Sequence, residues 1–135
     1  MIEQSSWEES DRIQVKSLKV VCGTGGPSTS ELTLIVDGKE KAVKAIGDGP
    51  VDAAFNAVNS IISHTARLQL YQVHAVTEGT DAQAIVSVKM EENGKISTGE
   101  SADTDTVVAS TKAYVNALNR LLIRRQKVGL DIADI

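Results

Sequence analysis

The order of apolar, polar and turn-forming residues repeats once along the chain. In the first half, an alternating run from Ile13 to Val21 is followed by the turn-rich stretch CGTGGPS, a hairpin around Asp37-Gly38 and a helical pattern after residue 50. Alternation with period two indicates strands and an Asp-Gly pair indicates a tight hairpin, whereas apolar residues three and four positions apart indicate a helix. The expected helix face consists of Val51, Ala54, Phe55, Val58, Ile61 and Ile62.

The second half follows the same order. Strand-like residues occur from Leu68 to Val76, TEGTDA is expected to form a turn, and a second hairpin is expected around Asn93-Gly94. The stretch SADTDT then offers Asp103, Thr104 or Asp105 as the cap of a second helix. That helix is expected to bury Val108, Thr111, Tyr114, Val115, Leu118, Leu121 and Leu122. The two helices have similar sequences, NAVNSII at 56–62 and NALNRLL at 116–122.

The repeat predicts an α+β fold. Each unit reads strand, strand, strand, helix, so the chain should form two pseudo-repeated βββα units whose antiparallel strands pack with two helices. Neither unit could bury its own sheet face alone, and we therefore expect one body. The predicted limits are a linker or tag remnant at 1–12, a regulatory domain at 13–126 with units 13–64 and 68–125, and a C-terminal tail at 127–135.

Composition excludes several classes of function. A chain of 135 residues fits a single domain, and its net charge of −4 with only 3% aromatic residues argues against nucleic-acid binding. An RNA-binding domain would need a basic, aromatic surface. No apolar stretch is long enough to cross a bilayer, and the N-terminal MIEQSSWEESDR is unlike a signal peptide. We expect a cytoplasmic protein with no membrane partner, in which the lone Cys22 is a small buried core residue.

Residues for catalysis or metal binding are sparse. His64 is expected at the end of the first helix, where a cationic ring would complement the helix dipole, and His74 within a strand as a partly buried packing residue. No metal-ligand spacing is present, and the two carboxylates of DTD at 103–105 favour a helix cap over a cation site. GTGGPS at 23–28 lacks the ending of a phosphate loop and precedes a strand. We therefore expect neither a catalytic site nor a cofactor.

The turn GDGP at 47–50 stands where the first helix begins. Pro50 at the first helical position is common, but two glycines around an aspartate exceed what a helix start requires. Gly47 and Gly49 would permit positive φ and leave the free N–H groups of the first turn open to a carboxylate, while Asp48 could receive an ammonium group. An α-amino acid would suit this turn. The residues alone favour a plain helix cap over a binding site.

The stretches GDGPVDAAFNAV, GTDAQAIVSVKM and DTDTVVASTKAYVNALNRLL resemble the C-terminal regulatory domain of α-isopropylmalate synthase, a domain that citramalate synthase shares. The resemblance covers about Val15 to Arg125. It implies two βββα units and a role in feedback inhibition, in which the end-product amino acid binds where two copies meet in a homodimer. Nothing in the chain corresponds to the catalytic barrel of that family, so the chain looks like an excised regulatory fragment without enzyme activity, starting at an added Met1.

The resemblance also implies which residues hold the effector. Carried onto matching positions, it points to Gly47, Asp48, Gly49 and Val51 in the turn, to Leu68, Tyr71 and Ala75 on the following strand, and to Ala84 and Ile85 after GTDAQ. The second helix, from Thr104 onward, looks like the pseudo-symmetric counterpart of the turn. The other implied partner is the catalytic domain of the same enzyme.

Leucine is the effector that the resemblance favours, because STGESADTDTVVAS is closer to the isopropylmalate branch. Isoleucine, the effector of the citramalate branch, differs only in where one methyl group branches, which is worth about 1–3 kcal/mol in an apolar pocket. A third reading is a purely structural dimerisation module in which GDGP serves only as a cap.

Overall fold

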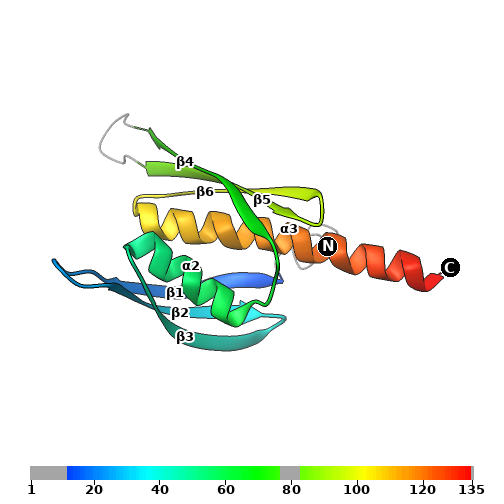
Figure 1. Ribbon diagram of the computed structural model, residues 1–135, viewed down its shortest axis with the longest axis horizontal. Coiled ribbons are helices and arrows are strands. Elements are labelled where there is room, and N and C mark those ends of the chain that lie inside the picture. Colours follow the sequence, from blue (N-terminus) through cyan, green and yellow to red (C-terminus); the bar gives the residue numbers. More distant parts are fainter. Residues whose placement is uncertain (1–11, 77–82, 135) are drawn as a thin grey trace, which may run out of the picture.

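The chain folds into two units of identical element order (Figure 1). The computed structural model describes residues 12–76 and 83–134, so the predicted turn TEGTDA lies outside the described residues. The first unit contains β1 (Ile13–Val21), β2 (Ser28–Val36), β3 (Lys39–Gly47) and helix α2 (Pro50–Ile61). The second contains β4 (Arg67–Val76), β5 (Gln83–Glu92), β6 (Lys95–Asp103) and helix α3 (Thr106–Asp134). The predicted pair of βββα units is confirmed.

Each unit forms its own three-stranded antiparallel sheet, in the order β1-β2-β3 and β4-β5-β6. The connection through CGTGGPS therefore joins an antiparallel pair, as the sequence predicts. Both tight hairpins are confirmed as well. Asp37 and Gly38 have φ values of 52° and 84°, and Asn93 and Gly94 have 52° and 81°. Two successive positive φ values match the twist of the flanking strands, which explains the Asp-Gly and Asn-Gly pairs.

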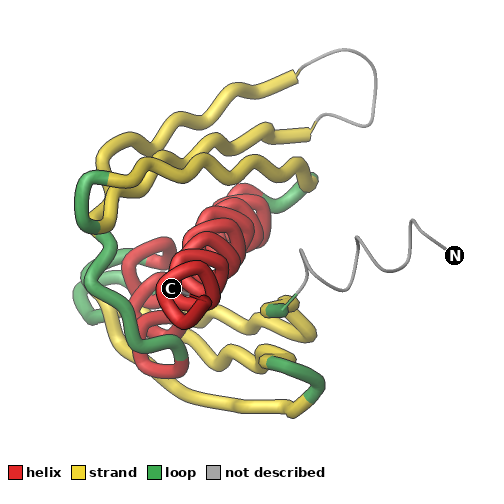
Figure 2. Tube along the Cα trace, turned by 90° about the vertical axis from the view of Figure 1, so that its right-hand side faces the viewer, coloured by secondary structure: helices red, strands yellow, loops and turns green. Residues whose placement is uncertain are grey.

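The two helices lie between the two sheets. Figure 2 shows one sheet on either side of the helices, and Figure 1 shows both helices beginning at the same end of the molecule. Helix α2 packs against β2 and β3, whereas α3 packs against β5 and β6 and also contacts β1. We call the helix-facing side of each sheet its inner face.

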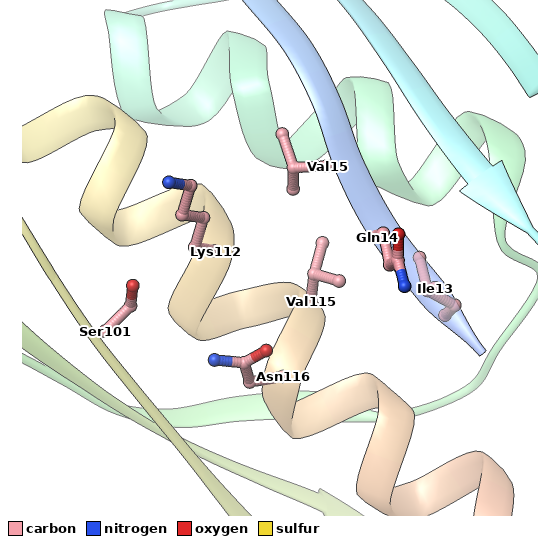
Figure 3. A pocket seen from close by; sticks show the side chains of 7 residues that line it. All are labelled: Ile13, Gln14, Val15, Ser101, Lys112, Val115 and Asn116. Carbon is pink, nitrogen blue, oxygen red and sulfur yellow. The ribbon is translucent and has the colours of Figure 1, made fainter. Parts of the chain in front are cut away.

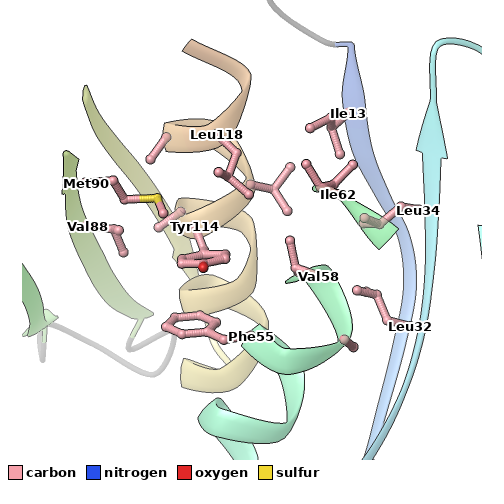
Figure 4. Close-up of a cluster of buried hydrophobic side chains, with 14 of the residues drawn as sticks. Ile13, Leu32, Leu34, Phe55, Val58, Ile62, Val88, Met90, Tyr114 and Leu118 are labelled. Carbon is pink, nitrogen blue, oxygen red and sulfur yellow. The ribbon is translucent and has the colours of Figure 1, made fainter. Parts of the chain in front are cut away.

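The core fills the space between the sheets and the helices (Figure 4). Leu32 and Leu34 on β2 and the alternate residues Val86, Val88 and Met90 on β5 are almost fully buried, which is the period-two pattern of a sheet covered on one face. The predicted helix faces are confirmed: Phe55, Val58 and Ile62 in the first, and Tyr114, Val115, Leu118 and Leu121 in the second, are buried.

Asn119 ties the two units together. Its side chain accepts a hydrogen bond from the backbone N–H of Ile13 and donates one to the carbonyl of Ile13, both at 2.8 Å and both buried. A side-chain amide offers one acceptor and two donors, and it here substitutes for a neighbouring strand at the start of β1. The second helix therefore satisfies the backbone of the first sheet.

Two expectations about single residues are wrong. Cys22 is exposed, because it follows the last residue of β1 in the loop that leads to β2. His74 is also exposed, because it lies on the outer face of β4, which no helix covers. An isolated apolar or aromatic residue in a strand-like run does not reveal which face of the sheet is covered.

Candidate functional site

Helix α2 begins without a side-chain cap. Gly49 is the N-cap residue, Pro50 follows, and no side-chain cap hydrogen bond is present among the described residues. The first intrahelical bond runs from the N–H of Ala53 to the carbonyl of Gly49, at 2.9 Å. The N–H groups of Val51 and Asp52 precede this bond and stand at the positive end of the helix dipole. This helix start is suited to a carboxylate supplied from outside.

The prediction that Gly47 and Gly49 adopt positive φ is wrong. Gly49 has a φ of −142°, which any residue adopts, and Gly47 is not among the described residues with positive φ. Gly47 is required for close packing instead, because a Cβ there would overlap the backbone nitrogen of Ala53. A Cβ on Gly49 would meet nothing within 4 Å. Only Gly49 leaves the approach to the helix open, and Asp48 beside it is exposed.

The predicted strand residues share the inner face of β4. Leu68, Tyr71 and Ala75 pair with Met90, Val88 and Ala84 of β5. Leu68 and Tyr71 are three positions apart, which would place them on opposite faces of a regular strand, but a bulge between Leu68 and Leu70 restores the shared face.

Ile85 is the exception among the predicted residues. It pairs with His74, one position out of phase with the Ala75–Ala84 pair, and so lies on the outer face of the sheet. The structure brings Ala84 together with the other strand residues on the inner face and places Ile85 apart from them. Ala84 is 8% exposed.

Three aromatic rings connect the turn to β4. Phe55 of α2 stacks on Tyr114 of α3, with ring centroids 4.2 Å apart (Figure 4), and meets the ring of Tyr71 edge-on at 6.1 Å. The hydroxyl of Tyr71 is 2.6 Å from the hydroxyl of Ser110 on α3. Such stacked and edge-on pairs are favourable geometries for aromatic rings. Since Phe55 lies one turn after Val51, the cluster fixes α2 relative to the inner face of β4.

The sequence analysis did not place Phe55, Ser110 and Tyr114 beside the candidate site. A usable signal existed, because aromatic residues are only 3% of the chain and two of them fall on the predicted buried helix faces. The pairing between the halves, however, depends on how the helices pack, which the sequence pattern does not specify.

The polar ends of this cluster are also satisfied. Tyr114 donates a hydrogen bond to Oδ1 of Asn59 at 2.8 Å, and burial raises the pKa of the Tyr114 hydroxyl. Nε2 of His64 lies 2.6 Å from the same Asn59 oxygen. Nδ1 of His64 accepts the N–H of Ala66, at 3.1 Å, so the ring carries its proton on Nε2. His64 thus orders the segment after α2, and our interpretation of it as a cation for the helix dipole is wrong.

The free N–H groups at the start of α3 are capped by an aspartate of the same chain. Oδ1 of Asp105 accepts the N–H of Val107 at 2.8 Å and that of Val108 at 3.3 Å, which confirms Asp105 as the cap among the three residues considered. Asp103 accepts the N–H of Asp105 at 2.9 Å, a bond that lowers the pKa of Asp103, with a further lowering by Lys112. This counterpart of the α2 turn has no free seat for an external anion.

Two cavities are described elsewhere on the molecule. The first, of about 350 Å³, lies between β1, β6 and α3 (Figure 3) and is lined by Ile13, Gln14, Val15, Ser101, Lys112, Val115 and Asn116. The second, of about 280 Å³, is lined by residues of β4, β5, β6 and by Arg120. Neither is lined by any of the predicted site residues. The predicted site residues thus lie at a helix start and on a sheet face, outside both of these cavities.

The part of the chain at residues 12–76 and 83–134 contains no group of three or more His, Cys, Asp or Glu side chains that could hold a metal ion. None of its helices is long and apolar enough to span a membrane.

Comparison with known proteins identifies the family. Residues 1–122 match the family described as the LeuA allosteric (dimerisation) domain. The chain belongs to this family. It is similar to 2-isopropylmalate synthases of Caulobacter sp. strain K31, with 59% identity, and of Bradyrhizobium sp. strain BTAi1, with 50% identity, in each case over 127 residues and 94% of this chain. The matched region is 24% of each relative, so the chain spans about a quarter of the length of these enzymes. The resemblance inferred from GDGPVDAAFNAV and the second helix is confirmed.

Proposed function

We propose that this LeuA-type domain binds leucine and mediates feedback inhibition of a 2-isopropylmalate synthase. The observation that carries the proposal is the uncapped start of α2, which lies in a chain that belongs to an allosteric domain family. Allosteric control requires a site at which an effector distinguishes two arrangements of the protein. Within this domain, the α2 turn is suited to that role.

The effector would bind with its carboxylate at the N–H groups of Val51 and Asp52. Charge-assisted hydrogen bonds to N–H groups at a helix N-terminus hold anions well. Asp48, exposed next to Gly49, would receive the ammonium group. An aliphatic side chain would extend toward the inner face of β4, where Leu68 is 44% exposed and Tyr71 is fixed by Ser110.

A homodimer would complete the site. Leu68 and Val73 on the inner face of β4 are 44% and 43% exposed in the single chain. Apolar side chains left half-exposed beside a binding site are typical of a surface that another chain covers. We propose that the second copy closes the open side of the effector site, so that effector binding and dimer geometry are linked.

The similarity to 2-isopropylmalate synthases supports the rest of the proposal. The domain would transmit effector occupancy to a catalytic region in a cytoplasmic enzyme of leucine biosynthesis, without catalytic chemistry or a cofactor of its own. Isoleucine is the second candidate effector. The two ligands would be distinguished by the shape of the wall around Leu68 and Tyr71, and Ala75 and Ala84 extend the same face.

Titration calorimetry with leucine, isoleucine and valine tests the proposal. The oligomeric state is measured on the same sample by light scattering. We expect a dimer, one high-affinity leucine site per chain, and at least tenfold weaker binding of valine at that site. A dimer that gives no heat with any of the three amino acids would instead support a purely structural module. Tighter binding of isoleucine than of leucine would favour the citramalate branch.

A further inference from the structure

A second pocket lies on the outer face of the sheet formed by β4, β5 and β6, and Arg120 of α3 also lines it. It has a volume of about 280 Å³, and its lining includes the side chains of Leu70, Ser87, Lys89, Thr98, Glu100 and Arg120. We call it the β5–β6 pocket. The register explains how it is built, because Leu70, Lys89 and Thr98 form one row across the three strands, and Ser87 and Glu100 pair in the next.

The pocket contains two cations and one carboxylate. Arg120 projects from α3 to the free edge of β6, where its Nη1 donates to the carbonyl of Thr98 at 2.7 Å and to the Thr98 hydroxyl at 3.4 Å. The guanidinium has further N–H donors beyond these bonds. Among the described side chains, neither Lys89 nor Arg120 forms an ion pair. Glu100 accepts a hydrogen bond from Ser87 through Oε2 at 3.1 Å, so its other oxygen can accept from a ligand.

The side chains of this pocket are suited to binding a small organic anion. An arginine already held by hydrogen bonds to Thr98 loses less side-chain entropy when it binds a carboxylate, and its planar guanidinium can donate two parallel hydrogen bonds to a carboxylate. Leu70, which is 38% exposed, offers an apolar wall. The volume of about 280 Å³ is enough for a short-chain metabolite.

We propose that the β5–β6 pocket binds a short-chain carboxylate that bears a hydroxyl or ammonium group beside the carboxyl group. The carboxylate contacts Arg120 and Lys89, the neighbouring polar group donates to Glu100, and the aliphatic end lies against Leu70. This site is separate from the α2 turn, because no residue of that turn or of the predicted effector wall lines it.

The test is a titration followed by backbone amide NMR of the whole chain. The probes are 2-hydroxy-3-methylbutanoate, valine and acetate, each added at constant ionic strength. We expect the amide signals of residues 87–89 and 98–100 to shift and saturate at millimolar concentrations of the hydroxy acid or of valine. If only the hydroxy acid or only valine saturates, the result identifies whether Glu100 accepts a hydrogen bond from a hydroxyl or from an ammonium group.

Lys89→Met is the decisive variant, with Lys95→Met as a matched control in the adjoining hairpin. Lys89→Met should raise the half-saturation concentration at least tenfold, and Lys95→Met should leave it unchanged. Arg120→Gln, checked for an unchanged fold by its melting temperature, should act like Lys89→Met. The proposal is overturned if the shifts grow linearly without saturation, if Lys89→Met titrates like the wild type, or if acetate saturates at the same concentration as both probes. Shifts at residues 47–53 report the effector site and are scored separately.

Discussion

The two helices begin in opposite ways, although their units share one element order. Helix α2 follows a glycine turn and has no side-chain cap, whereas Asp105 accepts two N–H groups at the start of α3. The difference shows that a repeated fold does not repeat its ligand chemistry. One helix start is open to an external carboxylate and the other is occupied by an internal one, so we expect one effector per chain.

A second contrast concerns the similar sequences of the two helices. Asn59 and Asn119 occupy the same place in NAVNSII and NALNRLL. Asn119 is buried and holds the backbone of Ile13, whereas Asn59 is exposed and serves Tyr114 and His64. The same residue thus joins the two units in one case and orders the junction after α2 in the other. Four predictions test these contrasts.

The largest effect is expected where a helix touches its sheet. A Cβ on Gly47 would overlap the backbone of Ala53, and one on Gly99 would overlap the backbone of Ala113 and Ala117. Because backbone atoms cannot rotate away, Gly47→Ala and Gly99→Ala should each lower the free energy of unfolding by about 3 kcal/mol or more. Urea denaturation measures this loss. Gly49→Ala is the control, because a Cβ at Gly49 would meet open space. An equal loss of unfolding free energy in Gly49→Ala would refute the conclusion that, of the two glycines in the turn, only Gly47 is required for close packing.

The asparagine pair should differ next. Asn119→Ala leaves the buried N–H and carbonyl of Ile13 without partners, so we expect a loss of about 2–4 kcal/mol in unfolding free energy. Asn59→Ala removes one exposed and one part-buried hydrogen bond and should cost about 1 kcal/mol, less than Asn119→Ala. Both variants are compared in the same denaturation experiment. Equal losses would mean that the two residues have equivalent roles and would remove this contrast between the units.

Exchanging the caps should separate stability from binding. Gly49→Asp gives α2 the cap that α3 has, and the φ of −142° at Gly49 accepts aspartate. The helix should be stabilised by roughly a few tenths of a kcal/mol, because glycine is itself a fair cap. Leucine binding should weaken at least tenfold, which corresponds to about 1.4 kcal/mol. Calorimetry and thermal melting measure the two effects.

The reverse change completes that experiment. Asp105→Ala should destabilise the protein by about 1 kcal/mol and leave leucine binding unchanged. Unaltered leucine affinity in Gly49→Asp would show that the carboxylate does not bind at the α2 turn.

The smallest effect concerns Asp103. Its pKa is lowered from 3.8 in the folded protein, first by the N–H of Asp105 and then by Lys112. A lowered folded-state pKa gives stability that is present above the unfolded value and is lost as pH falls through the folded value. Asp103→Asn should therefore melt slightly below the wild type at neutral pH, with the difference closing below about pH 4. A melting-temperature difference that stays constant from pH 7 to pH 3 would contradict the role of this carboxylate.

The local features of this protein were determined by its sequence. The alternation around Leu32 and Val86, the Asp37-Gly38 and Asn93-Gly94 hairpins and the cap at Asp105 each depend on neighbours within a few positions. Backbone sterics and local hydrogen bonds act over that range, so the two βββα units and their helix faces could be predicted. The family resemblance likewise came from continuous stretches such as GDGPVDAAFNAV.

Only the tertiary structure decided which residues meet. The role of Gly47 depends on the backbone of Ala53, and the cluster of Phe55, Tyr71 and Tyr114 joins three elements. The outer-face position of Ile85 and the exposure of His74 depend on where a helix covers the sheet. These facts follow from the packing of both helices between two sheets, which maximises burial over the whole chain. The sequence pattern of one element does not reveal which surfaces pack together, because the buried area depends on both surfaces that meet.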